Sequence, residues 1–400
     1  MYGISKLTKT GYELEDVNII QAPISHIRHR SECDPMIDIC GIKAYPVIVA
    51  PMGAVTDENN YKIWLKNNFI CVVPRTVNLD KRLEICTGLS FGVSNTFASF
   101  SLKEAEDVLM YLPVYDESNG FHYKRYVCID LAHGTMSALY DVCKALKTRY
   151  GNNMVIMTGN VATPDAYPFY ADAGIDYMRC SIGQGSRCTT SCNVGVHYPS
   201  ATLLDDLRVR RDKFYGKTYG SFCQTEGNET QIILDGGISN FDDIQKALCL
   251  GADAVMSGSI FAKAEEACEQ ILLLNPDNPD VNDAIPFDKF QETVDFLMKC
   301  DDDSKEFSQG FEKIFKRKPY RVYYGMSTKF AQTKTGGNGT TTSEGIIKPI
   351  PVEYPIAKWA ENMASYLRSC MSYTGCKTIK ELKEDTELII NLSGDKSFRK

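Results

Sequence analysis

One cysteine of this 400-residue chain lies in a segment whose residue types could carry out covalent chemistry. Residues 181–190 read Ser-Ile-Gly-Gln-Gly-Ser-Arg-Cys-Thr-Thr. Gly183 and Gly185 permit a tight turn whose exposed backbone groups could bind a phosphate or a monovalent cation. Cys188 follows on this polar turn beside two hydroxyl side chains, which makes it the candidate nucleophile. The alternative is a structural turn that carries an inert thiol.

Glycines also end two later apolar runs. Asp235 stands two residues before Gly237, and Gly258 and Ser259 follow the next run. Glycine turns after the seventh and eighth strands of a barrel commonly bind phosphate through backbone amides. Asp235 could accept hydrogen bonds from ribose hydroxyls. We therefore expect a phosphate site here, with two ordinary tight turns as the alternative.

A carboxylate and an imidazole end a further apolar run. Asp130 and His133 belong to the segment Asp-Leu-Ala-His-Gly at 130–134. These side chains could hold a second ligand, although a lone histidine is more often structural.

The elements that must position these residues are short apolar runs separated by turns and helical patterns. Continuous apolar runs of four to six residues are typical of parallel strands buried on both faces. Helical patterns follow at 102–109, 138–149 and 241–250. Eight strands that alternate with helices predict an α/β protein with a (β/α)₈ TIM barrel over about residues 45–265. The eight runs are 46–51, 69–74, 88–94, 126–130, 154–157, 177–180, 231–235 and 254–257.

We expect one catalytic barrel domain over residues 1–400, with additions after the eighth strand. These are an acidic, partly helical insertion at 264–318, a flap at 326–345 and a C-terminal segment at 346–400. The polar stretch 328–342 has almost no apolar side chains to bury, so the sequence predicts a mobile segment. Such a segment could be a lid over a site or a plain surface loop.

Composition and charge narrow the class of protein. Apolar residues make up 44% of the chain, which excludes disorder as its dominant state. The 44 Lys and Arg against 51 Asp and Glu predict no general attraction to nucleic acid or to anionic membranes. The 15 cysteines form no CxxC pair, and several lie in apolar runs, as Cys71 and Cys249 do. With no signal-like segment, a reduced cytoplasmic protein is expected.

Taken together in order, these motifs resemble those of the IMP dehydrogenase/GMP reductase family. The resemblance runs from about Tyr12 to Leu382, and an Arg-Ser-Glu-Cys-Asp block at 30–34 resembles a GMP reductase signature. The matching blocks are 12–17, 30–34, 50–55, 130–134, 159–161, 183–190, 235–237, 324–326, 343–345 and 367–375.

The resemblance implies roles for individual residues. Cys188 would attack C2 of a purine mononucleotide, and Thr190 and Glu344 would protonate the departing amine. The 5′-phosphate would be held by Ser186, Gly237, Gly258, Ser259 and Tyr323, and the ribose by Asp235. Around the base would lie Met52, Met326, Ser327 and Gly345. The nicotinamide side would be lined by Asp130, His133, Gly159 and Asn160, and K⁺ would be bound by the carbonyls of Gly183, Gly185 and Cys188.

Within the family, the sequence favours GMP reductase. The second and third strands are too close for the regulatory CBS pair that dehydrogenases usually carry, and no Arg lies between Gly325 and Glu344. The expected reaction is NADPH-dependent reductive deamination of GMP to IMP and ammonia through a covalent Cys188–C2 thioimidate, with NADH or NAD as other possible cofactors. A homotetramer that binds no nucleic acid and no membrane is implied.

Three alternatives stay open at this point. One is a CBS-less IMP dehydrogenase that oxidises IMP to XMP with NAD, because the segment 368–376 is closer to the corresponding dehydrogenase motif. The others are an FMN-dependent barrel oxidoreductase and a non-catalytic nucleotide-binding protein. The chain also departs from the family at Gly53, Gln184, Ser191 and His197. A deoxy or modified purine nucleotide is therefore a further possible substrate.

Overall fold

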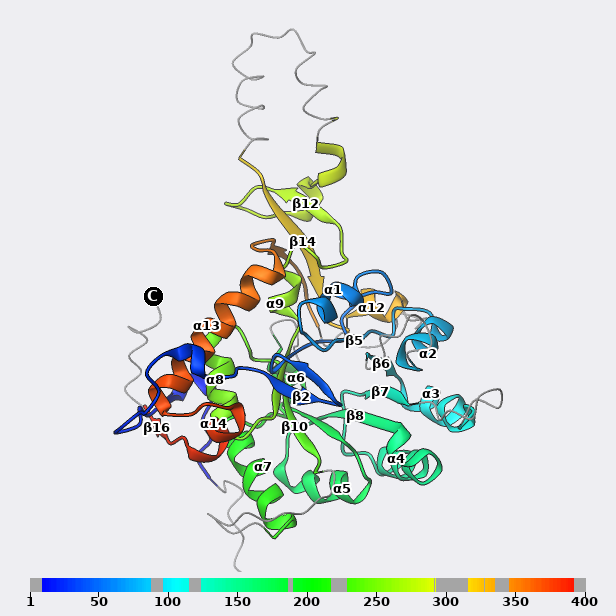
Figure 1. The fold of residues 1–400 in the computed structure, drawn as a ribbon. Helices are drawn as coiled ribbons and strands as arrows, with labels where there is room; N and C mark the ends of the chain where they lie inside the picture. The colour runs from blue at the N-terminus through cyan, green and yellow to red at the C-terminus, as the bar shows by residue number, and fades with distance from the viewer. Residues whose placement is uncertain are drawn as a thin grey trace, which may run out of the picture.

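Eight parallel strands form the central sheet of the molecule (Figure 1). The computed structural model describes residues 9–87, 96–114, 124–185, 190–216, 229–290, 292, 316–326, 328–334 and 345–391. In chain order the strands are β4 (Val47–Val49), β5 (Val72–Val73), β6 (Phe97–Phe100), β7 (Arg125–Asp130), β8 (Met154–Val161), β9 (Tyr177–Cys180), β10 (Gln231–Asp235) and β11 (Ala254–Ser257).

The sheet returns to its starting strand, as a barrel requires. From β5 to β11 each strand pairs with the next one along the chain, and β11 pairs in parallel with β4. Between β4 and β5 there is a parallel bridge from Val49 to Cys71, in which Val49 N–H donates to the Ile70 carbonyl over 2.9 Å. The predicted (β/α)₈ barrel is therefore confirmed.

The third barrel strand is not where the sequence pattern placed it. Residues 88–94 were the expected strand, but β6 is Phe97–Phe100, and residues 88–95 lie outside the described part of the chain. A helix cap explains the position of β6. The Ser101 side chain accepts a hydrogen bond from the Glu104 N–H, and Glu104 bonds back to Ser101, so α3 begins directly after Phe100.

Side chains alternate along each strand between the barrel interior and the surrounding helices. The hairpin of β2 (Ile37–Ile39) and β3 (Ile42–Ala44) packs against the interior set. Figure 1 shows β2 lying across the barrel. The interior set includes Ile48, Val72, Phe97, Tyr126, Cys128, Met157, Ile233 and Met256.

Helices cover the outside of the barrel through apolar stripes. In α4, the buried residues Leu139, Cys143, Leu146 and Tyr150 recur every three or four positions, which places them on one helix face. Such burial stabilises the fold by about 1.5–3 kcal/mol for each large apolar side chain. The helices around the barrel are α1 (Tyr61–Lys66), α2 (Leu79–Thr87), α3 (Leu102–Asp107), α4 (Ser137–Tyr150), α5 (Tyr167–Asp172), α6 (Thr190–Val194), α7 (Ser200–Phe214), α8 (Phe241–Cys249) and α9 (Ser259–Ala262).

A second, antiparallel sheet follows the barrel, and Figure 1 shows it projecting beyond the helices. The expected insertion at 264–318 therefore contributes strands, which the sequence pattern had not indicated. Their ladder joins segments more than forty residues apart, with Leu274 opposite Lys318. In spatial order the strands are β13 (Ile285–Pro286), β12 (Ile271–Leu274), β14 (Lys318–Tyr324) and β15 (Ile347–Pro351).

The beginning of the polar flap is helical instead of irregular. Residues Lys329–Lys334 form α12, in which Ala331 is fully buried. Thr328 starts this helix by accepting a hydrogen bond from the Ala331 N–H over 3.2 Å. Within the expected flap at 326–345, residues 327 and 335–344 lie outside the described part of the chain.

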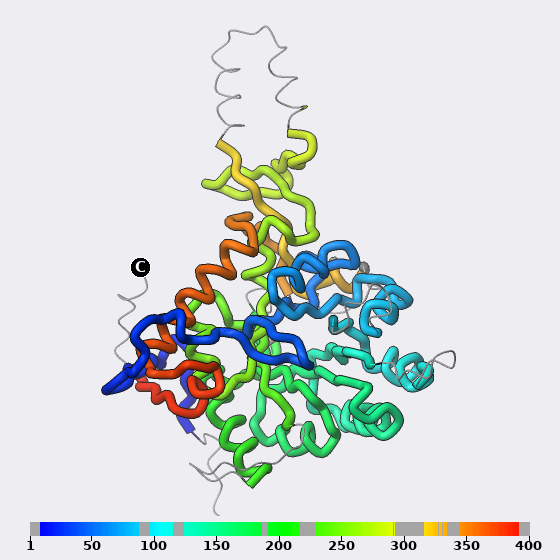
Figure 2. The backbone as a smooth tube through the Cα atoms, viewed as in Figure 1, coloured from blue at the N-terminus to red at the C-terminus, as the bar shows by residue number. Residues whose placement is uncertain are grey.

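The two ends of the described chain lie side by side (Figure 2). Strand β1 (Val17–Ile19) pairs antiparallel with β16 (Leu388–Ile390), beyond helices α13 (Ile356–Thr374) and α14 (Ile379–Asp385). Within the described ranges, we find no helix with the length and hydropathy needed to cross a bilayer.

Candidate functional site

The carboxyl ends of the barrel strands enclose a cavity of about 550 Å³. This volume falls within the range of small-molecule binding sites. Parallel barrels carry their functional residues at this end. The lining includes Met52, Arg75, Asp130, Asn160, Arg179, Ser181, Gly183, Gln184, Gly185, Asp235, Gly237, Gly258, Ser259, Tyr323, Met326 and Gln332.

Strand alternation directs charged side chains into this cavity. Cys128 and Ile233 face the barrel interior, so the residues two positions later, Asp130 and Asp235, face the same way at the strand ends. Arg179 on β9 is paired with Ile233 in the strand register and also lines the cavity. The register of neighbouring strands therefore brings two carboxylates and one guanidinium together.

Arg179 joins the two carboxylates directly. Its Nη1 donates to Asp130 Oδ1 over 2.6 Å, and its Nη2 donates to Asp235 Oδ2, also over 2.6 Å. Only 5% of Arg179 is exposed. At the outer side of the network, Arg75 Nε lies 3.9 Å from Asp130 Oδ2. The result is a chain of alternating charges across the floor of the cavity.

This arrangement favours the charged forms of Asp130 and Arg179. Burial alone would raise the pKa of Asp130, but the positive charges of Arg179 and then Arg75 hold it below its usual value. Burial would lower the pKa of Arg179, and the charges of Asp235 and Asp130 instead keep it well above its usual value. Asp130 therefore carries a negative charge at neutral pH.

Backbone hydrogen bonds hold Asn160 between the strands. Its N–H donates to the Leu131 carbonyl over 2.7 Å, and its carbonyl accepts from the Gly134 N–H over 2.9 Å. Its side-chain Nδ2 then donates to Asp235 Oδ2 over 2.8 Å and to the Ser181 carbonyl over 3.0 Å. Asn160 thus ties the charged network to the start of the cysteine-bearing segment.

The turn after β10 approaches the cysteine-bearing segment closely. Gly236 and Gly237 have φ angles of +95° and +74°, which L side chains rarely adopt. A Cβ on Gly236 would lie 2.9 Å from the backbone nitrogen of Gly185. Glycine is therefore needed here for two loops to meet.

A second glycine, Gly258, makes room for two side chains from other elements. A Cβ at this position would overlap Met52 Sδ and Tyr323 Oη. Tyr323 Oη donates to Met52 Sδ over 3.2 Å. Because Tyr323 belongs to β14, the antiparallel sheet contributes a wall to the barrel cavity.

Ser181 has an unusual backbone and an unusual side chain. Its φ of +96° is rare for a non-glycine residue. The residue is 1% exposed and lines the cavity, and among the described residues no partner lies within hydrogen-bond distance of its Oγ. A hydroxyl group that could both donate and accept is thus placed at the cavity wall.

The structure brings most of the predicted binding residues to this one cavity. His133 is exposed on the turn after β7, with Nδ1 3.2 Å from Thr135 Oγ1, and is not among the described lining residues. Gly159 and Gly345 are also not among the described residues that line the cavity. Outside the described residues lie Ser186, Cys188, Ser327, Glu344 and the side chain of Thr190. The predicted residues that line the cavity are Met52, Asp130, Asn160, Gly183, Gly185, Asp235, Gly237, Gly258, Ser259, Tyr323 and Met326.

Sequence reasoning missed Arg75, Arg179, Ser181 and Gln332 as cavity residues. For Arg179 a signal was present. It lies in the middle of an otherwise apolar strand, two positions from the strand start, where alternation predicts the same orientation as Asp235 on the neighbouring strand. No comparable pattern marks Gln332, which belongs to α12.

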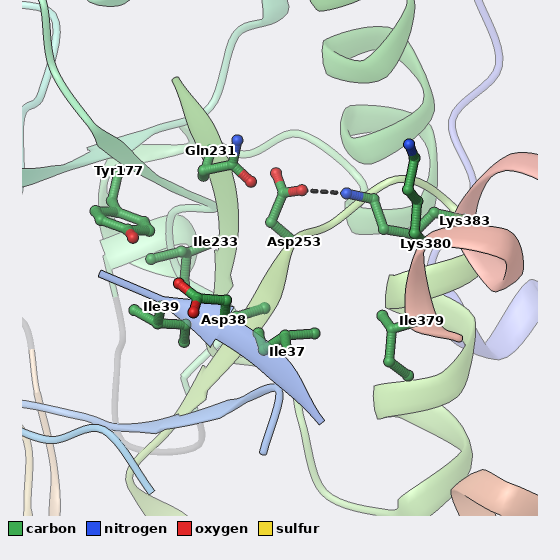
Figure 3. A pocket seen from close by; sticks show the side chains of 11 residues that line it. Ile37, Asp38, Ile39, Tyr177, Gln231, Ile233, Asp253, Ile379, Lys380 and Lys383 are labelled. Carbon is green, nitrogen blue, oxygen red and sulfur yellow. Dashed lines mark hydrogen bonds and ion pairs between the residues drawn. The ribbon is translucent and has the colours of Figure 1, made fainter. Parts of the chain in front are cut away.

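A smaller cavity of about 160 Å³ lies at the opposite end of the strands (Figure 3). Its lining comes from the first residues of β9 to β11, the β2–β3 hairpin and α14. Lys383 forms an ion pair with Asp253 there. Asp253 also accepts hydrogen bonds from Arg211 Nη1 over 3.0 Å and from the Ile232 N–H over 2.7 Å. These contacts attach α14 to the barrel, which is a structural role.

Comparisons with known proteins agree with this geometry. A family model described as the IMP dehydrogenase / GMP reductase domain matches residues 124–278 and 304–395, which is more than half of the chain. A GMP reductase of Exiguobacterium sp. is 30% identical over 257 residues, covering 64% of this chain and 72% of the relative. A GMP reductase of Onchocerca volvulus is 23% identical over 349 residues, covering 85% and 78%.

Dehydrogenases also match. An inosine-5′-monophosphate dehydrogenase of Chlorobaculum parvum is 28% identical over 275 residues, covering 66% of this chain and 44% of the relative. The matched region therefore spans less than half the length of this dehydrogenase and most of the length of the two reductases.

Proposed function

Because the chain belongs to the IMP dehydrogenase/GMP reductase family of oxidoreductases that act on purine nucleotides, we propose that it catalyses the NADPH-dependent reductive deamination of GMP to IMP and ammonia. The observation that carries the choice of reaction is the short connection between β5 and β6. Only residues 74–96 separate these strands, which leaves no room for a regulatory domain pair. The segment 326–343 contains no Arg that could activate a hydrolytic water, which supports the same choice.

The mononucleotide would bind across the ends of the last two barrel strands. Backbone groups of Gly237, Gly258 and Ser259, together with Ser186 and Tyr323, would hold its phosphate. Asp235 would accept hydrogen bonds from the ribose, since Arg179 and Asn160 already fix its orientation. Met52 and Met326, with Ser327 and Gly345, would surround the purine.

The other side of the cavity would accept the nicotinamide of the cofactor. A 550 Å³ cavity with Asp130, Arg179 and Asn160 on its wall is suited in size and polarity to this group. A bound nicotinamide cofactor supplies a hydride. His133 and Gly159 stay assigned to this side by the resemblance alone.

Cys188 would act as the nucleophile. Its thiolate forms a bond to C2 of GMP, and the 2-amino group leaves as ammonia with a proton delivered through Thr190 and Glu344. C2 then accepts two electrons as a hydride, the Cys188–C2 bond breaks, and IMP and the thiolate are released. In this scheme Arg179 holds Asp130 and Asp235 in place through its two hydrogen bonds, and its charge favours the ionised form of Asp130.

A monovalent cation would be held by backbone carbonyls of Gly183, Gly185 and Cys188. The described part of this segment is compatible with such a site: Gly183 has φ +80°, and among the described residues its carbonyl accepts one long side-chain hydrogen bond, from Ser191 Oγ over 3.4 Å. A carbonyl oxygen has a second lone pair for a cation. Turnover in K⁺ compared with turnover in tetramethylammonium salt would test this assignment.

The decisive experiment is an assay of both directions of purine chemistry. With GMP and NADPH, absorbance at 340 nm should fall while IMP and ammonia form in equal amounts. A rise at 340 nm with IMP and NAD⁺, with XMP as product, would replace the proposal by the dehydrogenase reaction. Cys188→Ala should abolish turnover and leave GMP binding, measured by calorimetry, within about threefold of wild type. Full activity of this variant would eliminate the covalent mechanism.

The proposed roles of Thr190 and Glu344 can be separated from that of Cys188. Glu344→Gln should slow ammonia release more than it slows hydride transfer, because only the first step needs a proton delivered to the leaving group. Single-turnover measurements of ammonia and of absorbance at 340 nm would show the difference. Equal slowing of both steps would contradict the assignment.

A further inference from the structure

Glu13, which precedes the barrel, accepts hydrogen bonds from a part of the chain more than 170 residues away. Gln184 Nε2 donates to its two carboxylate oxygens over 3.0 and 2.9 Å. Ser200 donates through both Oγ, over 2.7 Å, and its backbone N–H, over 2.9 Å. His197 Nε2 lies 2.7 Å from Oε1. One carboxylate is thus a shared acceptor for three residues between positions 184 and 200.

These partners lie at the two ends of the cysteine-bearing segment. Gln184 stands just before residues 185–199, and Ser200 is the first residue of α7 directly after them. Cys188 belongs to the segment between. A further contact also joins the two ends of the segment, since His197 Nδ1 lies 3.1 Å from the Ile182 carbonyl. Both ends of the segment are therefore fixed to one point.

Glu13 is itself held in place without help from the segment. The Tyr12 N–H donates to Thr202 Oγ1 over 2.7 Å, and the Tyr12 carbonyl accepts from the Ala201 N–H over 3.1 Å. These bonds attach the backbone next to Glu13 to α7, which belongs to the barrel. The Glu13 side chain can thus fix the segment relative to the barrel.

The clamped end of the segment rests directly on the proposed nucleotide site. A Cβ on Gly237 would lie 3.3 Å from the side-chain oxygen of Gln184, and one on Gly236 would lie 2.9 Å from the Gly185 nitrogen. A shift of Gln184 would therefore move the segment relative to the turn that follows Asp235. Displacements of about 1 Å can cost an enzyme on the order of a hundredfold in rate.

We propose that Glu13 is a positioning residue, which joins the two ends of the segment 185–199 and thereby sets the place of Cys188 relative to the nucleotide site. The inference rests on the proposed function for its catalytic consequence. The charged form of Glu13 is favoured: burial would raise its pKa, but the hydrogen bonds from Ser200, His197 and Gln184 lower it.

The test is Glu13→Gln, which keeps the size of the side chain and replaces one acceptor oxygen with a donor. The new NH₂ group would face Gln184 Nε2 or Ser200 Oγ, which already donate to this position. We expect kcat for GMP to fall about tenfold or more while KM changes less than about twofold. Hydrogen exchange in peptides covering residues 182–199 should become about threefold faster or more.

Glu32→Gln is the matched control. Glu32 also belongs to the chain before the barrel and also accepts backbone N–H bonds, from Arg28 and His29, both over 3.0 Å. Within the described part of the chain, its hydrogen bonds and ion pair do not involve the cysteine-bearing segment. This variant should leave kcat and the exchange of residues 182–199 at wild-type values.

The outcomes distinguish the positioning role of Glu13 from the proposed reaction. If Glu13→Gln leaves both kcat and exchange like Glu32→Gln, or speeds exchange without changing kcat, the positioning role is wrong. If the wild type oxidises IMP and does not reduce GMP, the proposed function fails. The kcat for IMP oxidation then tests the positioning role of Glu13 in the same way. Should Glu13→Gln not fold, Gln184→Ala and Ser200→Ala each remove one partner and should each speed exchange of residues 182–199. Wild-type exchange in both variants would overturn the positioning role.

Discussion

Arg179 Nη2 lies 2.6 Å from Asp235 Oδ2, on a side chain that is almost fully buried. The Nε of the same guanidinium lies 3.1 Å from the same oxygen. A buried carboxylate without a cation would be costly. Arg179 is therefore the counter-charge of Asp235 at the end of β10, and it links the stability of the barrel to the proposed substrate site.

Arg179→Met should destabilise the fold because it leaves two largely buried carboxylates without their shared cation. Removal of one partner from a buried ion pair costs about 3–5 kcal/mol. Urea unfolding at pH 7 measures the change, and Arg179→Lys should lose less, since it keeps the charge without the fork geometry. A Met variant within about 0.5 kcal/mol of wild type would show that water or other groups replace the guanidinium.

Asp130 should make stability depend on acid pH. Its folded pKa is lowered from 3.8, mainly by Arg179 and then Arg75, against the effect of burial. A group with a lowered folded pKa adds stability above its unfolded pKa, and this contribution is lost as the pH falls through the folded value. Asp130→Asn should thus differ most from wild type near pH 7, with the difference shrinking below about pH 4.

Urea midpoints measured from pH 2.5 to pH 7 for both proteins would check this. Asp38, an exposed acid on the β2–β3 hairpin, provides the control substitution Asp38→Asn. A wild-type to Asp130→Asn difference that stays constant down to pH 2.5 would contradict the lowered pKa.

Sequence patterns predicted the barrel well, because buried parallel strands are local features. Runs such as 231–235 and 254–257 match β10 and β11 residue for residue in the structure. The failure at 88–94 arose because apolar content alone located the strand. The Ser101–Glu104 capping box marks the start of α3 and would have placed the strand at Phe97–Phe100.

The site was predictable only in part, because its key contacts join distant positions. Asp130 and Asp235 stand at strand ends and were found from that placement alone. The role of Arg179 depends on the register that sets β9 beside β10 and near β7, which no local pattern reports. The ladder of β12 with β14 is similarly non-local.

Lys383→Met should lower stability without changing turnover. Lys383, on α14, pairs with Asp253 below the barrel (Figure 3), and burial of Asp253 would raise its pKa if Lys383 and Arg211 did not lower it. Loss of one partner of a buried carboxylate costs about 1–3 kcal/mol. Because the pair lies at the amino ends of the strands, kcat and KM for GMP should stay at wild-type values.

The control for this prediction is Lys358→Met. Lys358 forms an exposed ion pair with Glu361 over 2.9 Å on α13, and exposed pairs contribute about 0–1 kcal/mol. Urea unfolding should therefore separate the two variants. A fall in kcat for Lys383→Met would instead mean that the lower cavity communicates with the upper one.

Ser181→Gly should stabilise the protein and weaken its binding of the nicotinamide cofactor. A non-glycine residue at φ +96° carries strain of about 1–3 kcal/mol, which glycine relieves at a smaller cost in backbone entropy. We therefore expect a gain of about 1 kcal/mol in unfolding free energy.

The buried hydroxyl of Ser181, next to the Asn160 amide that bonds the Ser181 carbonyl, is a ready partner for a carboxamide. Its loss should raise KM for NADPH about two- to tenfold. Ser181→Ala separates the two effects, because it removes the hydroxyl and keeps the strain: it should show the raised KM without the gain in stability. Unchanged KM for NADPH in both variants would mean that the hydroxyl does not face the cofactor.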